Sequence, residues 1–235
     1  MSSNQPSDNR RIIVFDVNET LLDIDALSPY FQHVFGDAKI MRQWFAELIL
    51  YSQTLSLSGK YVEFGELAVD VLAMVAKIKH AALSEASIDE FKQVLRYLPP
   101  HPEVAECLQR LRAAGFRLVT LTNSAPSASK AALERAGLAS YVEQQFSVGE
   151  VKRYKPALET YSMVSHALHV PTSALRMVAA HAWDTFGAMA AGYRAALVTR
   201  VGNAQLLIGP QPDIIESELG NAVDKIIAMD TPYPA

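Results

Sequence analysis

The sequence has few of the features that mark several large classes of protein. It contains a single cysteine, Cys107, which excludes an internal disulfide and whose place in a helical pattern favours a buried apolar role. Long runs of one charge are absent, and 21 lysines and arginines against 25 acids give a net charge of −4 at pH 7. This balance does not indicate a nucleic-acid or anionic-membrane partner, so small molecules are the expected ligands.

Long apolar runs are also missing. The first ten residues, MSSNQPSDNR, lack the apolar stretch of a signal peptide, and no later segment is long and apolar enough to span a bilayer. We therefore expect a cytoplasmic protein with no membrane partner. The 235 residues, 50% hydrophobic and 20% charged, are enough for one large core or for a core with a smaller inserted domain.

What the sequence does contain is an alternation of strand and helix patterns. Short apolar or β-branched runs occupy residues 11–15, 117–121, 145–148, 176–180 and 195–198. Helical patterns closed by glycines lie between the later runs. Strand and helix in alternation predict an α/β fold, a doubly wound parallel sheet with right-handed crossovers.

One segment interrupts this alternation, because its apolar residues recur at helical spacing only. Its last helix is predicted to begin at a capping box of Ser87 and Glu90. The prolines of YLPPHPEV then end the block, since proline disfavours a helix before it and suits the first turn of the next one. We predict an all-helical cap at residues 23–98, inserted in a core made of residues 9–22 and 99–232.

Polar residues follow the first four predicted strands. They are, in chain order, Asp16 with Thr20, Thr122 with Asn123, Lys155, and His181 with Asp184. In an open parallel sheet the ligand binds beyond the carboxyl ends of the strands, at the switch in strand order. We therefore expect these four groups to converge on one site.

The motifs FDVNETLLD, LTNSAP, VKRYKPALETY and HAWD, in this order, resemble those of the haloacid dehalogenase (HAD) superfamily. Within it they look most like the type II L-2-haloacid dehalogenases, and the resemblance covers nearly the whole chain. It implies a Rossmann-like core with a helical cap, a nucleophilic Asp16 and a homodimer. It further implies that Arg42 and Asn123 bind the halide, that Thr122 binds the substrate carboxylate, and that Tyr161 lies close to the site.

Two missing acids bear on the choice of reaction. Phosphatases of the superfamily need Mg²⁺ and an Asp two residues after the nucleophile to protonate the leaving group. That position is Asn18 here, and Ala180 stands where their fourth motif has its first acid. An alanine methyl group cannot bind Mg²⁺. Both losses favour displacement of halide, a leaving group that needs no proton, and we expect neither a metal nor a cofactor.

In this reaction Asp16 attacks the carbon that bears the halogen and forms an ester, which water then hydrolyses. Asp184 is predicted to position and deprotonate that water. Lys155 is predicted to keep Asp16 ionised and to stabilise the charge that develops during hydrolysis. Attack opposite the leaving group implies that short L-2-haloacids become D-2-hydroxy acids, with halide ion as the second product.

Simpler structural roles compete with several of these assignments. Thr20 suits the cap of a following helix as well as a contact with the substrate. Arg42 also suits a solvated helix face, and Tyr161 suits the packed core. His181 stands where the family has Asn, and substrate binding, tuning of Asp184 and a local hydrogen bond are all open roles for it. A phosphatase or phosphonatase of the same superfamily and a non-catalytic binding protein are the alternative functions.

The departures from the family pattern gather in two places. Asn18 and Glu19 replace the usual Tyr-Gly after the nucleophile, and Ala180 and His181 replace Ser-Asn before Asp184. We count Asn18 and His181 among the substrate-binding candidates. Because these positions surround the expected substrate, they leave its chain length and its halogen undefined.

Overall fold

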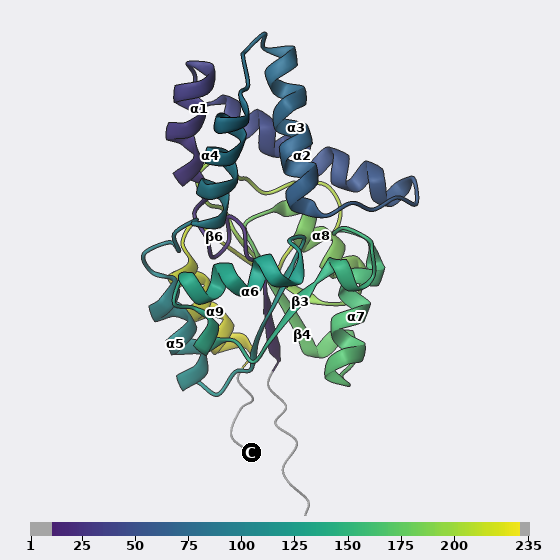
Figure 1. The fold of residues 1–235 in the computed structure, drawn as a ribbon. Helices are drawn as coiled ribbons and strands as arrows, with labels where there is room; N and C mark the ends of the chain where they lie inside the picture. The colour runs from purple at the N-terminus through teal and green to yellow at the C-terminus, as the bar shows by residue number, and fades with distance from the viewer. Residues whose placement is uncertain (1–10, 231–235) are drawn as a thin grey trace, which may run out of the picture.

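The computed structural model describes residues 11–230 and confirms the predicted α/β class (Figure 1). Its sheet has the order β3-β2-β1-β4-β5-β6, and every neighbouring pair of strands is parallel. The strands are β1 (Ile12–Phe15), β2 (Leu118–Thr122), β3 (Gln144–Ser147), β4 (Leu175–Ala179), β5 (Arg194–Val198) and β6 (Ile214–Glu216). The sequence did not predict β6, because three residues are too few to show a period. The predicted core limits at residues 9 and 232 lie outside the described residues.

Strand β1 lies in the middle of the sheet, between β2 and β4. Phe15, its last residue, pairs with Thr120 of β2 and with Val178 of β4. All residues of these three strands are buried, as expected for parallel strands that helices cover on both faces. The strand order turns at β1, so the chain leaving Phe15 enters the crevice where ligands bind in folds of this type.

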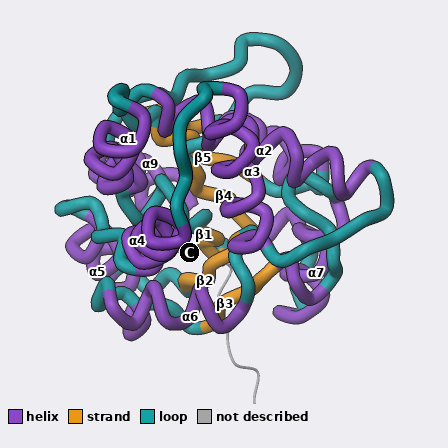
Figure 2. The backbone as a smooth tube through the Cα atoms, turned by 45° about the horizontal axis from the view of Figure 1, so that its top comes forward, coloured by secondary structure: helices purple, strands orange, loops and turns teal. Residues whose placement is uncertain are grey.

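Helices cover both faces of the sheet. They are α5 (Val104–Ala113), α6 (Pro126–Arg135), α7 (Leu158–Leu168), α8 (Ala182–Ala190) and α9 (Leu219–Asp230). In Figures 1 and 2, α5 and α9 lie on one side of the sheet and α7 lies on the other, where it packs against α8. No helix within residues 11–230 is long and apolar enough to cross a membrane.

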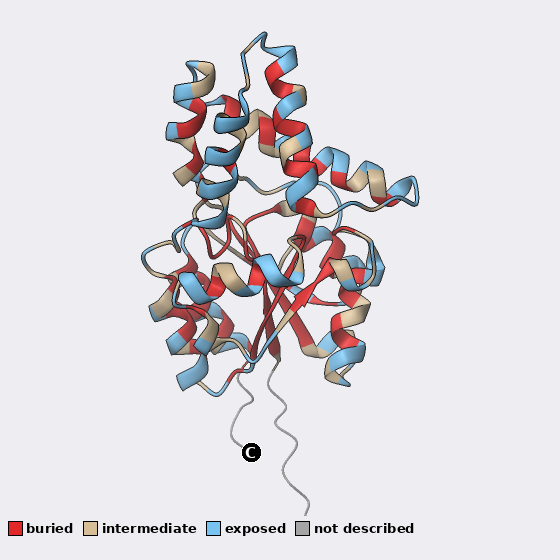
Figure 3. Ribbon diagram, viewed as in Figure 1, coloured by how far each residue is buried: buried red, intermediate tan, exposed pale blue. Residues whose placement is uncertain are grey.

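Four further helices stand over the carboxyl edge of the sheet (Figure 1). They are α1 (Ser28–Phe35), α2 (Ile40–Leu57), α3 (Phe64–Ile78) and α4 (Glu85–Arg96). Their buried faces, red in Figure 3, meet around an aromatic cluster in which the rings of Trp44 and Phe91 lie 5.2 Å apart. Helix α4 begins earlier than the predicted capping box, because the side chain of Ser84 accepts the hydrogen bond from the backbone N–H of Ser87.

Candidate active site

Asp16 is the first residue after β1, at the centre of the carboxyl edge. Its backbone N–H donates to the carbonyl of Val178, 3.0 Å away, so the pairing of β1 with β4 continues to the base of this side chain. The residue is 5% exposed. Because the strand ladder holds its backbone, the carboxylate has a defined position at the switch in strand order.

Lys155 joins Asp16 to a second buried carboxylate. Its Nζ donates to Asp16 Oδ1 at 2.8 Å, to Asp184 Oδ2 at 2.6 Å and to the carbonyl of Leu121 at 3.0 Å. All three ammonium protons are therefore used inside the protein. The backbone N–H of Lys155 donates to Asn123 Oδ1 at 3.0 Å, which ties the lysine loop to the end of β2.

Asp184 lies in the first turn of α8 and is completely buried. Its Oδ1 accepts a hydrogen bond of 2.7 Å from the hydroxyl of Tyr161 on α7, while Oδ2 accepts the one from Lys155. Tyr161 thus lies at the site and is also a core residue, with its hydroxyl directed at the carboxylate. The negative charge of Asp184 sits near a helix N-terminus, where the helix dipole favours it.

Burial and charge shift the pKa values of this group in different directions. Burial would raise the pKa of Asp16, but the positive charges of Lys155 and the neighbouring His181 hold it well below its ordinary value. Burial alone would lower the pKa of Lys155, but the two carboxylates outweigh this effect and raise the pKa above its ordinary value. For Asp184, burial and the charge of Asp16 outweigh the effect of Lys155 and raise the pKa. The nucleophile candidate is therefore ionised at neutral pH.

Thr20 contacts the same carboxylate from the loop after β1. Its hydroxyl donates to Asp16 Oδ2 at 2.8 Å and accepts from the backbone N–H of Ala180 at 2.9 Å. Each oxygen of Asp16 thus accepts one hydrogen bond from a buried donor. The loop that carries Thr20 is joined in this way to the end of β4.

His181 also approaches Asp16, at the same oxygen, Oδ2, that accepts from Thr20. The residue is 4% exposed, its Nε2 lies 2.7 Å from Glu19 Oε2, and its Nδ1 lies 3.5 Å from Asp16 Oδ2. The ring is stacked on Phe45 of α2 and on Trp183, with centroid distances of 5.5 and 5.0 Å. Burial would lower the pKa of His181, but the two carboxylates raise it to about 9.

Glu19 extends these contacts to α2, one of the four helices over the carboxyl edge of the sheet. It is 2% exposed, and its second oxygen forms an ion pair with the guanidinium of Arg42 on α2. Burial alone would raise the pKa of Glu19, but its contacts with His181 and Arg42 hold the pKa below its ordinary value. Arg42 also donates to Asp25 Oδ1 at 2.9 Å and to the carbonyl of Val201 at 3.0 Å. Arg42 is therefore joined to Asp16 through Glu19 and His181.

The sequence marked Glu19 only as a departure from the family pattern and did not identify it as a partner of His181. One signal in the sequence pointed to this pair. Glu19, after the first strand, and His181, after the fourth, both depart from the family pattern.

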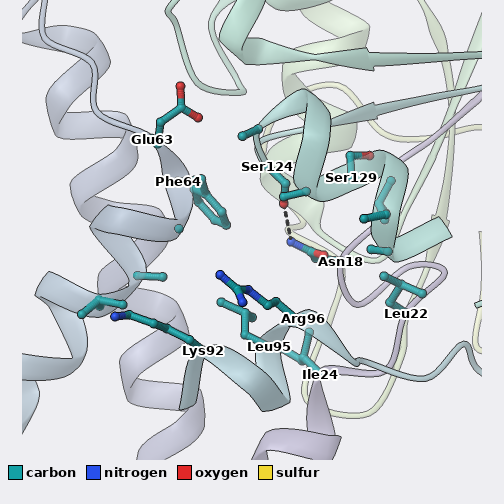
Figure 4. Close-up of a pocket in the computed structure, with 18 of the residues that line it drawn as sticks. Asn18, Leu22, Ile24, Glu63, Phe64, Lys92, Leu95, Arg96, Ser124 and Ser129 are labelled. Atoms are coloured by element: carbon teal, nitrogen blue, oxygen red, sulfur yellow. Dashed lines mark hydrogen bonds between the residues drawn. The ribbon is translucent and has the colours of Figure 1, made fainter. Parts of the chain in front are cut away.

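A cleft of about 1110 Å³ opens beside this cluster, between the helices over the carboxyl edge and the sheet (Figure 4). Its lining includes Val17 and Asn18, which directly follow Asp16, and Phe45 of α2 and Phe64 of α3. Asn18 Nδ2 donates to Ser124 Oγ at 3.3 Å on the core side of the cleft, opposite Phe64 in Figure 4. A small molecule in the cleft would lie against the loop that carries the nucleophile candidate.

Thr122 and Asn123 complete the predicted set at the end of β2. Both are buried, and Thr122 Oγ1 accepts from the backbone N–H of Ser124 at 3.2 Å. Within residues 11–230, no three His, Cys, Asp or Glu side chains are grouped so as to hold a metal ion. The local positive charges at Asp16 are those of Lys155 and His181.

A doubly wound sheet with a buried aspartate at its switch point, a lysine bound to that aspartate and helices over the site defines a Rossmann-like protein with a candidate active site centred on the aspartate. The family model for haloacid dehalogenase-like hydrolases matches residues 10–192. The chain belongs to this hydrolase family.

Individual relatives agree with this assignment. The chain is 26% identical over 218 residues to (S)-2-haloacid dehalogenase H-109 of Pseudomonas putida, covering 92% of this chain and 97% of the relative. It is 28% identical over 203 residues to the (S)-2-haloacid dehalogenase of Pseudomonas sp. strain YL, covering 86% and 88%. The L-2-haloacid dehalogenase of Xanthobacter autotrophicus with covalently bound chloropropionic acid has the same fold, with a TM-score of 0.86 at 22% identity and coverage of 94% and 99%.

Proposed function

We propose that this protein hydrolyses short-chain L-2-haloacids to D-2-hydroxy acids through an ester on Asp16, without a metal ion. The observation that carries the proposal is the position of Lys155 Nζ, 2.8 Å from Asp16 and 2.6 Å from Asp184. This buried ammonium group places a positive charge at Asp16 in a site where Asn18 and Ala180 stand in place of the acids that related phosphatases need. The two relatives described above are both (S)-2-haloacid dehalogenases, and this similarity supports the same reaction.

The first step is displacement of the halide. Asp16 is ionised, because Lys155 holds its pKa down, and it attacks the carbon that bears the halogen. Halide leaves as a weak base, so Asn18 need not donate a proton. In this proposal Thr122 binds the substrate carboxylate, and Asn123 and Arg42 bind the halide.

The second step is hydrolysis of the ester. Water attacks the carbonyl carbon of the Asp16 ester, and the Lys155 ammonium on Oδ1 stabilises the oxyanion that forms. Asp184 keeps this ammonium in place and charged, and Tyr161 orients Asp184. The role of Asp184 as the base for water stays a prediction, and we propose that residues 23–98 act as a cap that excludes bulk water during the attack.

The experiment is an assay of halide release in EDTA from L- and D-2-chloropropionate, chloroacetate and fluoroacetate. Phosphate release from an aryl phosphate with Mg²⁺ is measured beside it. We expect halide from the L-substrate and none after Asp16→Asn, while Asp37→Asn, at an exposed position of the cap segment, keeps full activity. Phosphate without halide would support the alternative phosphatase function. Release of neither halide nor phosphate would favour the alternative of a non-catalytic binding protein.

The homodimer and the cytoplasmic location stay predictions of the sequence. Light scattering of the protein as it elutes from a sizing column measures the mass of the particle in solution. A mass near 25.8 kDa, that of one chain, would contradict the predicted dimer.

A further inference from the structure

The two-step reaction gives no task to His181, a buried titratable side chain beside Asp16. The His181 ring is held between Phe45 and Trp183, and its Nε2 is bound to Glu19. Its Nδ1 has no hydrogen-bond partner among the described residues and lies 3.5 Å from Asp16 Oδ2. A buried imidazole oriented by a carboxylate on one nitrogen, with its other nitrogen facing a nucleophile, is arranged to transfer protons at that nucleophile.

We propose that His181, oriented by Glu19, takes the proton from the water that hydrolyses the Asp16 ester. The proposal rests on the proposed function, since it needs the ester. Asp184 is less well placed for this step, because its Oδ1 and Oδ2 already accept hydrogen bonds from Tyr161 and Lys155. The lone pair of His181 Nδ1 becomes free once the ring loses a proton.

The proton changes balance over one turnover. Asp16 Oδ2 bonds to the substrate carbon and the halide ion leaves. The imidazolium of His181 then releases its proton to solvent, so this half of the cycle releases one halide ion and one proton. Water then bonds to Cγ of Asp16 while its proton goes to Nδ1, and Lys155 holds the oxyanion on Oδ1. The bond from Cγ to Oδ2 breaks, and the alcohol oxygen takes the proton from Nδ1. Asp16, left as the carboxylic acid, returns its proton to His181 and restores the resting ion pair.

The charges around His181 change in the direction that this cycle needs. In the resting protein Asp16 and Glu19 both favour the imidazolium, and its pKa is about 9. Ester formation removes the charge of Asp16, so the pKa falls and the ring can act as a base near neutral pH. Beyond these two acids lie Lys155 on the far side of Asp16 and Arg42 on the far side of Glu19, and Asp184 follows three residues later on α8.

The test separates ester formation from ester hydrolysis by rapid quench with L-2-chloropropionate. Chloride per active site and the mass of the peptide that contains Asp16 are measured. For His181→Asn we expect a burst of one chloride per site, an ester that accumulates on Asp16, and turnover lower by about 100-fold or more. His166→Asn is the matched control. The side chain of His166 is exposed in the last turn of α7, away from Glu19 and Asp16, and we expect turnover to stay within about twofold.

Two results would overturn the assignment. One is a His181→Asn protein that turns over normally without ester, and the other is a protein that loses the burst itself, which would place His181 before the ester. Accumulation of ester in Asp184→Asn but not in His181→Asn would give the base role to Asp184. If the unsubstituted protein releases no halide from any of the haloacids, the proposed function fails, and this outcome is distinct because no variant then has a burst.

Glu19→Gln gives a second measurement that keeps the ring and a hydrogen-bonding group at Nε2. Removing the charge of Glu19 lowers the pKa of His181, so we expect the pH profile of ester hydrolysis to move to lower pH and its plateau rate to fall about tenfold. A pH profile that stays unchanged in Glu19→Gln would show that His181 is not the titrating base.

Discussion

Removal of the buried ammonium group tests the electrostatic basis of the site. Lys155→Met keeps most of the side-chain volume and leaves Asp16 and Asp184, which are 5% and 0% exposed, without the cation between them. Removing one partner of a buried ion pair costs about 3–5 kcal/mol of folding free energy, because the remaining charge is left without compensation. Two carboxylates remain here, so we expect a value in this range at pH 7.5 and complete loss of halide release.

The pH dependence of this loss has a definite sign. In the unsubstituted protein the lowered pKa of Asp16 contributes stability above the pKa of the unfolded chain, and that stability is lost as pH falls. In Lys155→Met the two buried carboxylates have raised pKa values, so protonation favours the folded state and stability is lost as pH rises. Asp16 loses its contribution only below the pKa of the unfolded chain, so between pH 5 and 7.5 the change comes from the substituted protein, and the difference is expected to be about half as large at pH 5 as at pH 7.5.

Urea unfolding at pH 5, 6 and 7.5, followed by tryptophan fluorescence, measures this difference. Lys152→Met is the matched control, because Lys152 is exposed and lies three residues away in the same loop, and its effect should stay within about 0.5 kcal/mol. A difference for Lys155→Met that is below about 1 kcal/mol at pH 7.5, or that does not change with pH, would refute the reasoning.

Three other measurements follow from the site. The pKa of His181, raised from 6.5 to about 9, contributes stability that is complete below pH 6.5 and is lost as pH rises through 9, so the melting temperature should fall over this interval and His181→Asn should flatten the slope. Tyr161→Phe removes the 2.7 Å hydrogen bond to Asp184 and should lower the free energy of unfolding by about 1–3 kcal/mol and slow turnover; equal melting curves and rates would contradict this role. Arg42→Gln should weaken inhibition by added chloride or bromide if Arg42 binds the halide, and unchanged inhibition constants would argue against that role.

Much of the site could be predicted because a parallel sheet imposes it. Strands that run in one direction end at one edge, so the segments that follow β1, β3 and β4 bring their polar residues toward one another whatever lies between them in the chain. Lys155 and Asp16 are separated by 139 positions, yet their side chains meet at 2.8 Å. Strand β6 escaped prediction because a run of three residues has no measurable period.

The partners of the charged residues were beyond the reach of the sequence. From the sequence, Arg42 could lie on a solvated helix face or bind the halide. Only the packing of α2 on the core placed its guanidinium against Glu19. Glu19 and His181 are 162 positions apart, and no local pattern relates them. A side chain of opposite charge anywhere in the chain satisfies the same sequence rule, so the choice among partners depends on which elements pack together.

The sequence by itself therefore determined the α/β class and the convergence of Asp16, Lys155 and Asp184, since both follow from strand periodicity and from the geometry of parallel strands. Only the tertiary structure decided that Nδ1 of His181 faces Asp16 and that Glu19 lies between His181 and Arg42. Buried charges stabilise a fold only when an opposite charge lies within a few ångströms. That distance is set by three-dimensional packing, which a one-dimensional pattern does not contain.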